Sequence, residues 1–251
     1  MKIISLGSGS KGNATLVEID GKYLLIDNGF TLREIEKRLE VSPKDISAIF
    51  VTHEHSDHVE GVGALAKAYA IPVHAPVVLR GVLEERCPDT EIVTHADNLF
   101  TVDGIEVTPF RLPHDARYTV GYKFQKGADS FASITDLGEI RPSVMENVRG
   151  VKAVLLESNY DQTMLRFGPY PEALKRRISG RLGHLSNDDA SKFAVELLSS
   201  GTETIILGHV SENNNAPEIA YDTTAKYIEK NLNFDTKITL GVAEQNKIKI
   251  F

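Results

Sequence analysis

The chain has 251 residues, of which 41% are hydrophobic and 25% charged, and its formal net charge is −7. This length can bury a large core and predicts one domain over residues 1–251, built from two similar halves, about 1–150 and 151–251. The negative net charge argues against a large basic surface. It is compatible with a local group of basic residues that leads to a metal site.

The start of the chain predicts neither a signal peptide nor a membrane span, because Gly7 soon interrupts the apolar residues that follow Lys2. The single cysteine, Cys87, cannot form an internal disulfide. We therefore expect a cytoplasmic protein that does not enter a membrane.

The first elements are predicted strands at 2–6, 14–19 and 23–27, the last two joined by a tight turn at Asp20-Gly21. Asp27 at the end of the third strand is placed to orient a histidine ring. Thr31 and Glu34 form a capping-box pattern, which predicts a helix through about residue 39.

A glycine-rich loop, residues 7–13, separates the first two strands. Such a loop can bring backbone N–H groups, with the side chains of Ser8 and Asn13, close to a phosphate, and a plain flexible connector explains it equally well. It lacks the Lys-Ser/Thr ending of a phosphate-binding P-loop, so we expect no nucleotide or other organic cofactor.

The predicted strand 47–51 runs directly into four residues of metal-binding type, His53, His55, Asp57 and His58. The first two imidazoles, at alternate positions, project toward one point. Asp57 and His58 lie where the next helix would begin and can face a neighbouring point. The spacing therefore favours two adjacent metal ions over one.

Further strands are predicted near 73, 92–93, 104–110, 119–124, 130–134, 153–156 and 204–207, with one or two more at the end of the chain. Helices are predicted at about 59–69, 76–86, 171–178, 186–198 and 217–230. His114, Asp136 and His209 each follow a predicted strand. His74 and His95 have no partners at ligand spacing, and we interpret them as structural or exposed.

The order His53-x-His55-x-Asp57-His58, His114, Asp136, His209 resembles the metallo-β-lactamase-fold hydrolases. The resemblance implies an α/β fold, a four-layer αβ/βα sandwich with the site between the sheet edges. It also implies two divalent ions, zinc or manganese: one held by His53, His55 and His114, the other by Asp57, His58 and His209, with Asp136 bridging.

Other residues narrow the resemblance. Glu157 and His184 look like a pair that tRNase Z enzymes carry beside the metals, in which the histidine protonates the leaving oxygen. Residues 5–13 and 208–215 look like the YycJ/WalJ-type subgroup, bacterial proteins regarded as 5′→3′ DNA exonucleases. The long substrate-clamping insertion of tRNase Z is not evident.

These features predict a dinuclear metal-dependent phosphodiesterase, specifically a 5′→3′ DNA exonuclease, in which a hydroxide shared by the metals attacks the phosphodiester. Asp57, Glu157 and His184 would be catalytic, and Ser8, Asn13 and Asn213 would hydrogen-bond the substrate. A small-molecule or cyclic-phosphate phosphodiesterase and a non-catalytic zinc-stabilised binding module are the alternatives. The sequence does not choose the metal or an oligomeric state.

Overall fold

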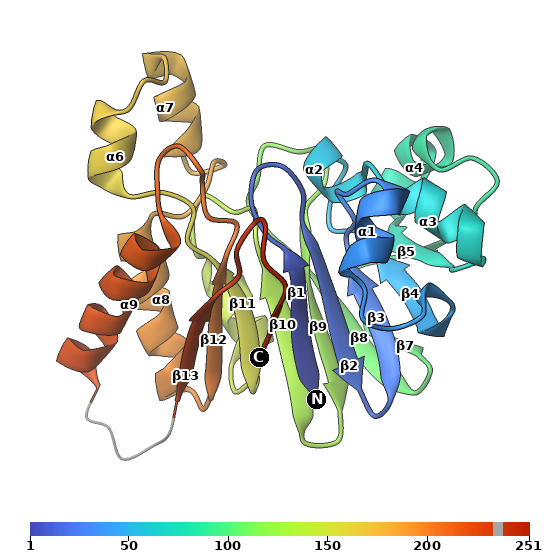
Figure 1. Cartoon of the computed structure of the whole chain (residues 1–251). Helices are drawn as coiled ribbons and strands as arrows, with labels where there is room; N and C mark the ends of the chain where they lie inside the picture. Colours follow the sequence, from blue (N-terminus) through green and yellow to red (C-terminus); the bar gives the residue numbers. More distant parts are fainter. Residues whose placement is uncertain (233–237) are drawn as a thin grey trace.

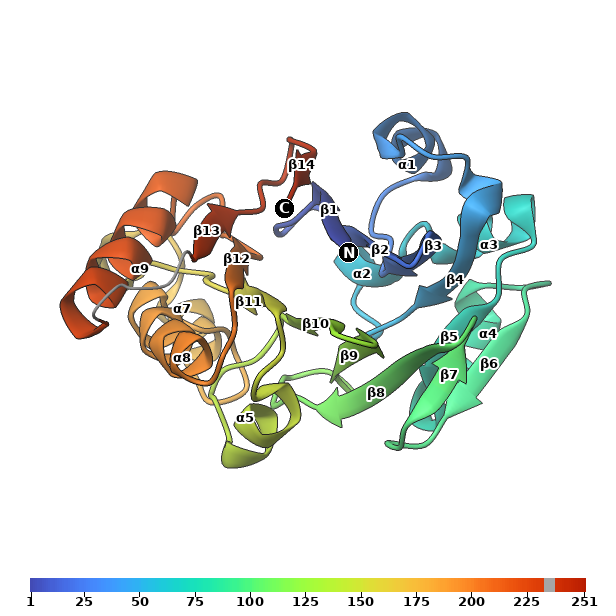
Figure 2. The same cartoon turned by 90° about the horizontal axis from the view of Figure 1, so that it is seen from below.

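Two mixed sheets lie face to face with helices on their outer faces, giving four layers (Figures 1 and 2). This computed structural model describes residues 1–232 and 238–251, and within them each sheet has seven strands. The predicted α/β sandwich is confirmed. Among the described residues, no helix combines the length and the apolar character that crossing a bilayer requires.

The first sheet has the order β14-β1-β2-β3-β4-β5-β6. Its strands are β1 (Lys2–Gly7), β2 (Ala14–Ile19), β3 (Lys22–Ile26), β4 (Ile46–Phe50), β5 (Val73–Pro76), β6 (Ile92–His95) and β14 (Lys249–Ile250). Strands β1 to β3 are antiparallel, and β3 to β6 are parallel. The predicted turn at Asp20 and Gly21 has positive φ at both residues, +52° and +72°, as a tight hairpin of primed type needs.

The second sheet has the order β13-β12-β11-β10-β9-β8-β7. Its strands are β7 (Phe100–Val102), β8 (Ile105–Arg111), β9 (Val120–Lys126), β10 (Asp129–Ile134), β11 (Ala153–Glu157), β12 (Thr204–Gly208) and β13 (Thr239–Val242). The chain passes to the second sheet at residues 96–99, well before residue 150, and returns to the first sheet with β14. The reason is that β10 pairs in parallel with β11, which joins the antiparallel β7 to β10 to the second sheet.

The helices cover both outer faces. Those on the first sheet are α1 (Leu32–Arg38), α3 (Val62–Tyr69) and α4 (Arg80–Arg86), and those on the second are α5 (Pro142–Val148), α8 (Asn187–Ser199) and α9 (Pro217–Asn231). Three short helices complete the set, α2 (Ser56–Val59), α6 (Gln162–Phe167) and α7 (Glu172–Ile178), with 3₁₀ turns at Pro43–Asp45 and Val77–Leu79. The capping box of α1 is present at Thr31 and Glu34.

Some elements differ from those predicted. The helix expected over 59–69 is two helices, α2 and α3, and the one expected over 76–86 begins as a 3₁₀ turn. The sequence did not indicate β7, α5 or α6. These three elements have only three to seven residues each, too few for an apolar periodicity to stand out.

Three hydrophobic cores match the layers. One lies between the first sheet and its helices and includes Ile35 and Leu65, and a second lies between the second sheet and its helices and includes Phe193. The third, with Phe50 and Phe131, fills the space between the sheets. Because both faces of each sheet are covered, the central strands are buried along most of their length, and polar side chains collect where strands end.

Candidate metal centre

The metal-type side chains come from the ends of β4, β8, β10 and β12 and from the start of α2. His53 follows β4, Asp136 follows β10, and His209 follows β12. Asp136 and His209 have left-handed backbones, with φ of +64° and +54°. This conformation is uncommon for residues other than glycine and is found where the surrounding structure enforces it, commonly at functional sites.

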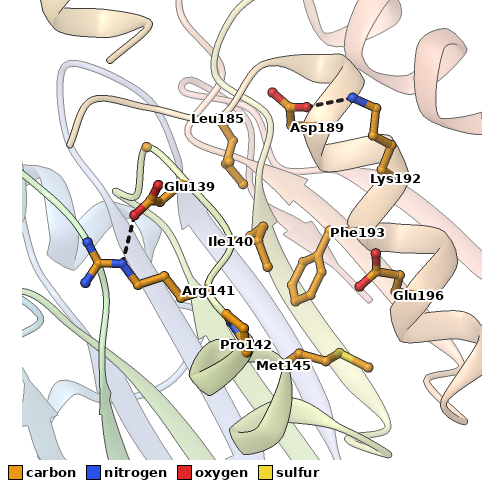
Figure 3. A pocket seen from close by; sticks show the side chains of 11 residues that line it. Glu139, Ile140, Arg141, Pro142, Met145, Leu185, Asp189, Lys192, Phe193 and Glu196 are labelled. Atoms are coloured by element: carbon orange, nitrogen blue, oxygen red, sulfur yellow. Dashed lines mark hydrogen bonds and ion pairs between the residues drawn. The ribbon is translucent and has the colours of Figure 1, made fainter. Parts of the chain in front are cut away.

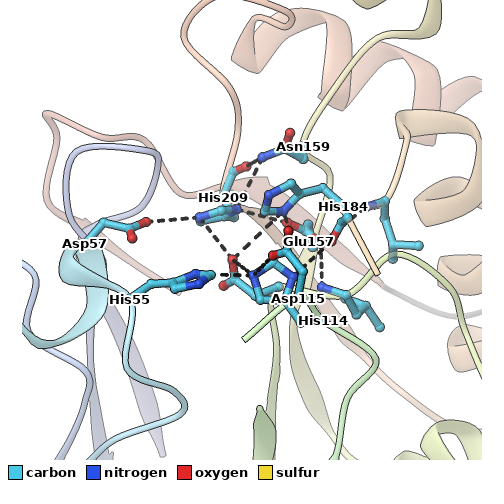
Figure 4. A network of polar contacts seen from close by, with 12 residues as sticks. His55, Asp57, His114, Asp115, Glu157, Asn159, His184 and His209 are labelled. Carbon is cyan, nitrogen blue, oxygen red and sulfur yellow. Dashed lines mark hydrogen bonds and ion pairs between the residues drawn. The ribbon is translucent and has the colours of Figure 1, made fainter. Parts of the chain in front are cut away.

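The seven residues predicted as metal ligands are brought together. Candidate ligand atoms lie within 4.8 Å of one another in four groups: His53–His55–His114, Asp57–His58–His209, His53–His58–Asp136, and one that joins Asp136 and His209 to Glu157 and His184. Asp136 lies between the first two groups: its carboxylate oxygens are 3.2 Å from His58 Nε2, 3.8 Å from His114 Nε2 and 3.5 Å from His209 Nε2. Figure 4 shows Asp57 and His55 facing the side chains of the second sheet.

Four histidine rings are held by their Nδ1 atoms. Nδ1 of His58 lies 2.7 Å from Asp27 Oδ2, Nδ1 of His114 lies 3.1 Å from the Gly183 carbonyl oxygen, and Nδ1 of His209 lies 2.9 Å from Glu157 Oε1. Nδ1 of His53 lies 3.0 Å from Thr52 Oγ1. A ring that donates from Nδ1 keeps a lone pair on Nε2, which is how metal-binding histidines are commonly oriented.

The bonds around Asp27 explain the orientation of two of these rings. The Thr52 hydroxyl donates to Asp27 at 2.7 Å, so its oxygen can accept from His53. The same carboxylate accepts from His58. Asp27 is therefore a supporting residue, as its place at a strand end predicted.

Several buried atoms lack a hydrogen-bond partner among the described residues. They include Nε2 of His53, Nε2 of His209 and Oδ2 of Asp136. A buried polar atom without a partner is costly, and these three belong to the converging groups. Imidazole nitrogens and carboxylate oxygens are the ligands that zinc and manganese accept, so the residues present fit divalent cations.

The carboxylates of the site favour positive charge at His209, whereas burial lowers the pKa of His53 and His55. Burial alone would lower the pKa of His209, but the carboxylates of Asp136, Asp57 and Glu157 outweigh it and raise that pKa to about 10. The pKa of Asp136 is held well below its usual value, because His209, His58 and His53 outweigh the effect of burial. A cation that takes the place of the bound protons would meet the same carboxylates.

Glu157 and His184 form the predicted pair at the edge of the centre. Nδ1 of His184 lies 2.7 Å from Glu157 Oε1, and the other carboxylate oxygen accepts backbone N–H groups from Leu137 and Leu185. Glu157 is fully buried, but interactions with His184 and His209 outweigh the desolvation of the carboxylate and lower its pKa to about 2. The carboxylate is therefore ionised at neutral pH, and it holds His184 and His209 by their Nδ1 atoms.

The glycine-rich loop supports the centre from the first sheet. Ser8 accepts a hydrogen bond from the His209 backbone N–H at 2.8 Å, and Asn13 Nδ2 donates to Asp57 at 3.2 Å. Both side chains are buried and are bonded to each other at 3.3 Å. Ser8 and Asn13 were predicted to contact substrate, and in the structure both side chains also make hydrogen bonds within the protein. Asn213, the third residue of that prediction, is exposed and donates to Tyr170 Oη at 2.9 Å.

A cavity of about 240 Å³ opens onto the centre. Its lining includes His55, Asp57, His114, Asp136, His184 and His209. It also includes residues that the sequence did not indicate, among them Asn159, Tyr170, Leu174 and Arg177. Asn159 donates to the His209 carbonyl oxygen at 2.7 Å, and Arg177 donates to Asp115, next to His114. Spacing in the sequence does not reveal these residues, because only folding brings α7, the segment just before it and the residues after β11 to the cavity.

The chain is similar in sequence and in structure to several known proteins. A family model described as "Beta-lactamase superfamily domain" matches residues 22–210. The chain is 36% identical over 232 residues to the exodeoxyribonuclease YycJ of Bacillus anthracis, covering 90% of this chain and 88% of that protein. It is 36% identical over 227 residues to the exodeoxyribonuclease WalJ of Streptococcus pneumoniae serotype 2, strain D39, covering 87% and 84%. Among solved structures, the metallo-β-lactamase-fold protein YhfI of Bacillus subtilis superposes with a TM-score of 0.74 at 14% identity, covering 100% of this chain and 99% of that one.

Proposed function

We infer the activity of this chain from one premise: it belongs to the β-lactamase superfamily and is homologous to the YycJ/WalJ-type exodeoxyribonucleases. It is a metal-dependent hydrolase of the nuclease and phosphodiesterase kind. Within this class of hydrolases, we propose a more specific activity. The chain removes nucleotides from DNA ends, with 5′→3′ polarity, at a centre that holds two divalent ions, zinc or manganese.

The observation that carries the proposal is the double set of converging ligands. His53, His55 and His114 would hold one ion, and Asp57, His58 and His209 the other, with Asp136 shared between them. When bound, a pair of divalent ions lowers the pKa of water and neutralises phosphate oxygens. A structural zinc site is closed by four protein ligands, whereas five of these seven side chains line an open cavity, namely His55, Asp57, His114, Asp136 and His209. This supports catalysis over a purely structural role.

The protein's own residues would handle the proton at the leaving group. Glu157 holds the His184 ring at Nδ1, so its other nitrogen is available toward the cavity that His184 lines. An imidazolium held there can donate to the departing sugar oxygen as a general acid. Ser8 and Asn13 would act by positioning His209 and Asp57, and Asn213 by holding Tyr170 at the cavity.

The proposed compartment is the cytoplasm. Cys87 is a free, buried thiol, and burial raises the pKa of its thiol group, so it is protected from oxidation and needs no disulfide partner.

The test is a digestion of oligonucleotides labelled at either end, single-stranded and duplex, with manganese or zinc added. We expect early release of a labelled mononucleotide from the 5′ end and resistance of a covalently closed circle. Release from internal positions would contradict the exonuclease proposal. Hydrolysis of cyclic nucleotides with no action on DNA would favour the small-molecule alternative, and no hydrolysis of any phosphodiester would favour the binding module.

A further inference from the structure

Helices α6 and α7 project from the sandwich on the side where α2 also lies (Figure 1). We name residues 161–181 the arm. The start of the arm is attached to the loop between β12 and α9, because the Asp161 backbone N–H donates to the Asn214 carbonyl oxygen at 2.8 Å. The inner face of α7 closes the metal cavity with Leu174, Arg177 and Ile178. The arm therefore separates the metal centre from whatever lies on its other side.

A second cavity, of about 690 Å³, lies on that other side. Its lining carries three cationic side chains of the arm, Arg166, Lys175 and Arg176. Consecutive residues on one helix thus face different cavities: Arg177 lines the metal cavity and Arg176 lines the second. A strand of nucleic acid that passes over α7 would meet both.

The charge of the second cavity is not balanced locally. Lys175 pairs with Glu172 at 3.2 Å, and Asp189, the other acid of the lining, pairs with Lys192 at 2.8 Å. Within residues 1–232 and 238–251, neither Arg166 nor Arg176 has a carboxylate within ion-pair distance. In a chain with a net charge of −7, two unpaired guanidinium groups in one cavity indicate an anionic ligand.

An exposed aromatic ring lies beside these arginines. Phe167 lines the same cavity and is 77% exposed, the largest value among the large hydrophobic residues described. The guanidinium carbon of Arg166 is 5.4 Å from the centre of its ring. An exposed ring next to unpaired cations is the arrangement that single-stranded nucleic acid uses, with a base stacked on the ring and its phosphate on the cation.

Another cavity, shown in Figure 3, differs in these respects. It has a volume of about 490 Å³ between α5 and α8, and its floor is apolar, with Ile140, Met145 and Phe193. Its cations are paired, since Arg141 donates to Glu139 and Lys192 donates to Asp189. Glu196 adds a further negative charge to its rim. This composition does not suit a polyanion, in contrast to the cavity beside the arm.

We propose that the outer face of the arm is a second binding subsite for a single strand of DNA, separate from the metal centre. Arg166 and Arg176 bind two backbone phosphates there, and Phe167 stacks on a base. The subsite holds the part of the strand that extends beyond the nucleotide being cleaved. This inference rests on the proposed function, because it requires a polymeric substrate.

The test compares Arg166→Gln/Arg176→Gln with a control of equal charge, Arg86→Gln/Arg149→Gln, at two exposed arginines outside the arm. The probes are a fluorescent single-stranded 20-mer and bis(p-nitrophenyl) phosphate. We expect the arm variant to weaken binding of the 20-mer about tenfold and to reduce the slope of log affinity against log salt by about 1.4, at about 0.7 for each lost phosphate contact. Hydrolysis of the small ester should stay within twofold of wild type.

Phe167→Ala provides an independent variant, because an exposed ring can be removed without disturbing the core. We expect it to weaken 20-mer binding about fivefold or more while leaving the salt slope unchanged. If wild type digests DNA and the arm variants bind like the control, the subsite is wrong and the proposed function stands. If wild type neither binds nor digests DNA but cleaves the small ester, the DNA function is wrong and the subsite falls with it.

Discussion

At the scale of single residues, the candidate ligands between His53 and His58 could be predicted because the four of them are close together in the sequence. His114, Asp136 and His209 were recognised from their order and from the strand that each follows. The partners that orient the rings were harder to predict. Asp27 was found from its strand-end position, whereas Thr52 and Asn159 contact histidines through bonds that exist only in the folded chain.

His184 provides the first prediction. His184→Ala should slow DNA hydrolysis about 100-fold, because the alkoxide leaving group loses its proton donor. Hydrolysis of a p-nitrophenyl phosphodiester should change less than threefold, since nitrophenolate leaves without protonation. The measurement is kcat on both substrates. His95→Ala, a histidine outside the metal centre, is the control and should leave both rates unchanged. Equal losses on the two substrates would show that His184 is not a general acid.

Ser8 and Asn13 have partners within the protein that the composition of their loop did not indicate. A loop rich in glycine and hydroxyl groups predicted contacts with phosphate. In the fold, Gly9 N–H donates to the Asn13 side chain at 2.9 Å and Ser8 bonds the His209 backbone. The loop was correctly placed at the site, but sequence alone could not show that these two side chains face the protein.

At the scale of elements, the loop after α7 positions two functional side chains at once. A Cβ added at Gly183 would lie 2.1 Å from the Ile178 carbonyl oxygen, so the loop would have to move. The Gly183 carbonyl oxygen holds His114, and the next residue is His184. The close approach of two backbone segments explains why glycine is needed there.

Gly183→Ala should therefore reduce kcat on DNA at least tenfold and weaken metal retention, because both His184 and His114 shift. The measurements are kcat and metal content after dialysis. Gly81→Ala is the matched control: it lies in α4, and nothing is within 4 Å of the added Cβ. That change should leave activity intact and stabilise the protein by about 0.5–1 kcal/mol. Wild-type kcat in Gly183→Ala would contradict the role of this loop.

Strands β5 and β6 hold a pair of histidines outside the metal centre. Nδ1 of His74 lies 2.8 Å from His95 Nε2, and both rings stack with Phe100. Burial, with a smaller effect of His95, lowers the pKa of His74 to about 4. The unfolded chain binds this proton near pH 6.5 and the folded chain only near pH 4, so stability falls as the pH decreases through that window.

His74→Asn should remove this part of the pH dependence. Between pH 7 and pH 5, wild type should lose about 2 kcal/mol more of its free energy of unfolding than the variant, as expected for a proton taken up only on unfolding. Urea unfolding at the two pH values measures the difference. Parallel losses in the two proteins would mean that His74 is not kept neutral by its burial.

At the scale of the whole molecule, the two-sheet sandwich was predicted from the family resemblance that the order of the metal-type residues carries. The point where the chain changes sheets was not, because it depends on which strands pair. β8 and β9 join the second sheet through β10, and their apolar faces pack in the core between the sheets, with Val107 and Phe124 among its members. The pairing that assigns these strands to the second sheet is the parallel one between β10 and β11, which lie on either side of α5, and no local pattern in the sequence indicates it.

Of the two helices in the arm, the sequence predicted only α7. The helix at 171–178 was expected, but α6 has six residues and no apolar repeat that would identify it. The basic residues of the arm are readable in the sequence, yet their division between two cavities depends on how α7 sits over the sandwich. The arm, which we propose to bind the substrate, is therefore described less well by the sequence than the metal centre is.

The most direct test of a dinuclear centre is the metal content of the purified chain by mass spectrometry, measured with kcat. We expect two metal ions per wild-type chain. Asp57→Ala should retain about one and lose at least 99% of DNA hydrolysis, while Asp222→Ala, at an exposed carboxylate on α9, should retain both. Full hydrolysis by a chain that holds one equivalent or none would contradict the account.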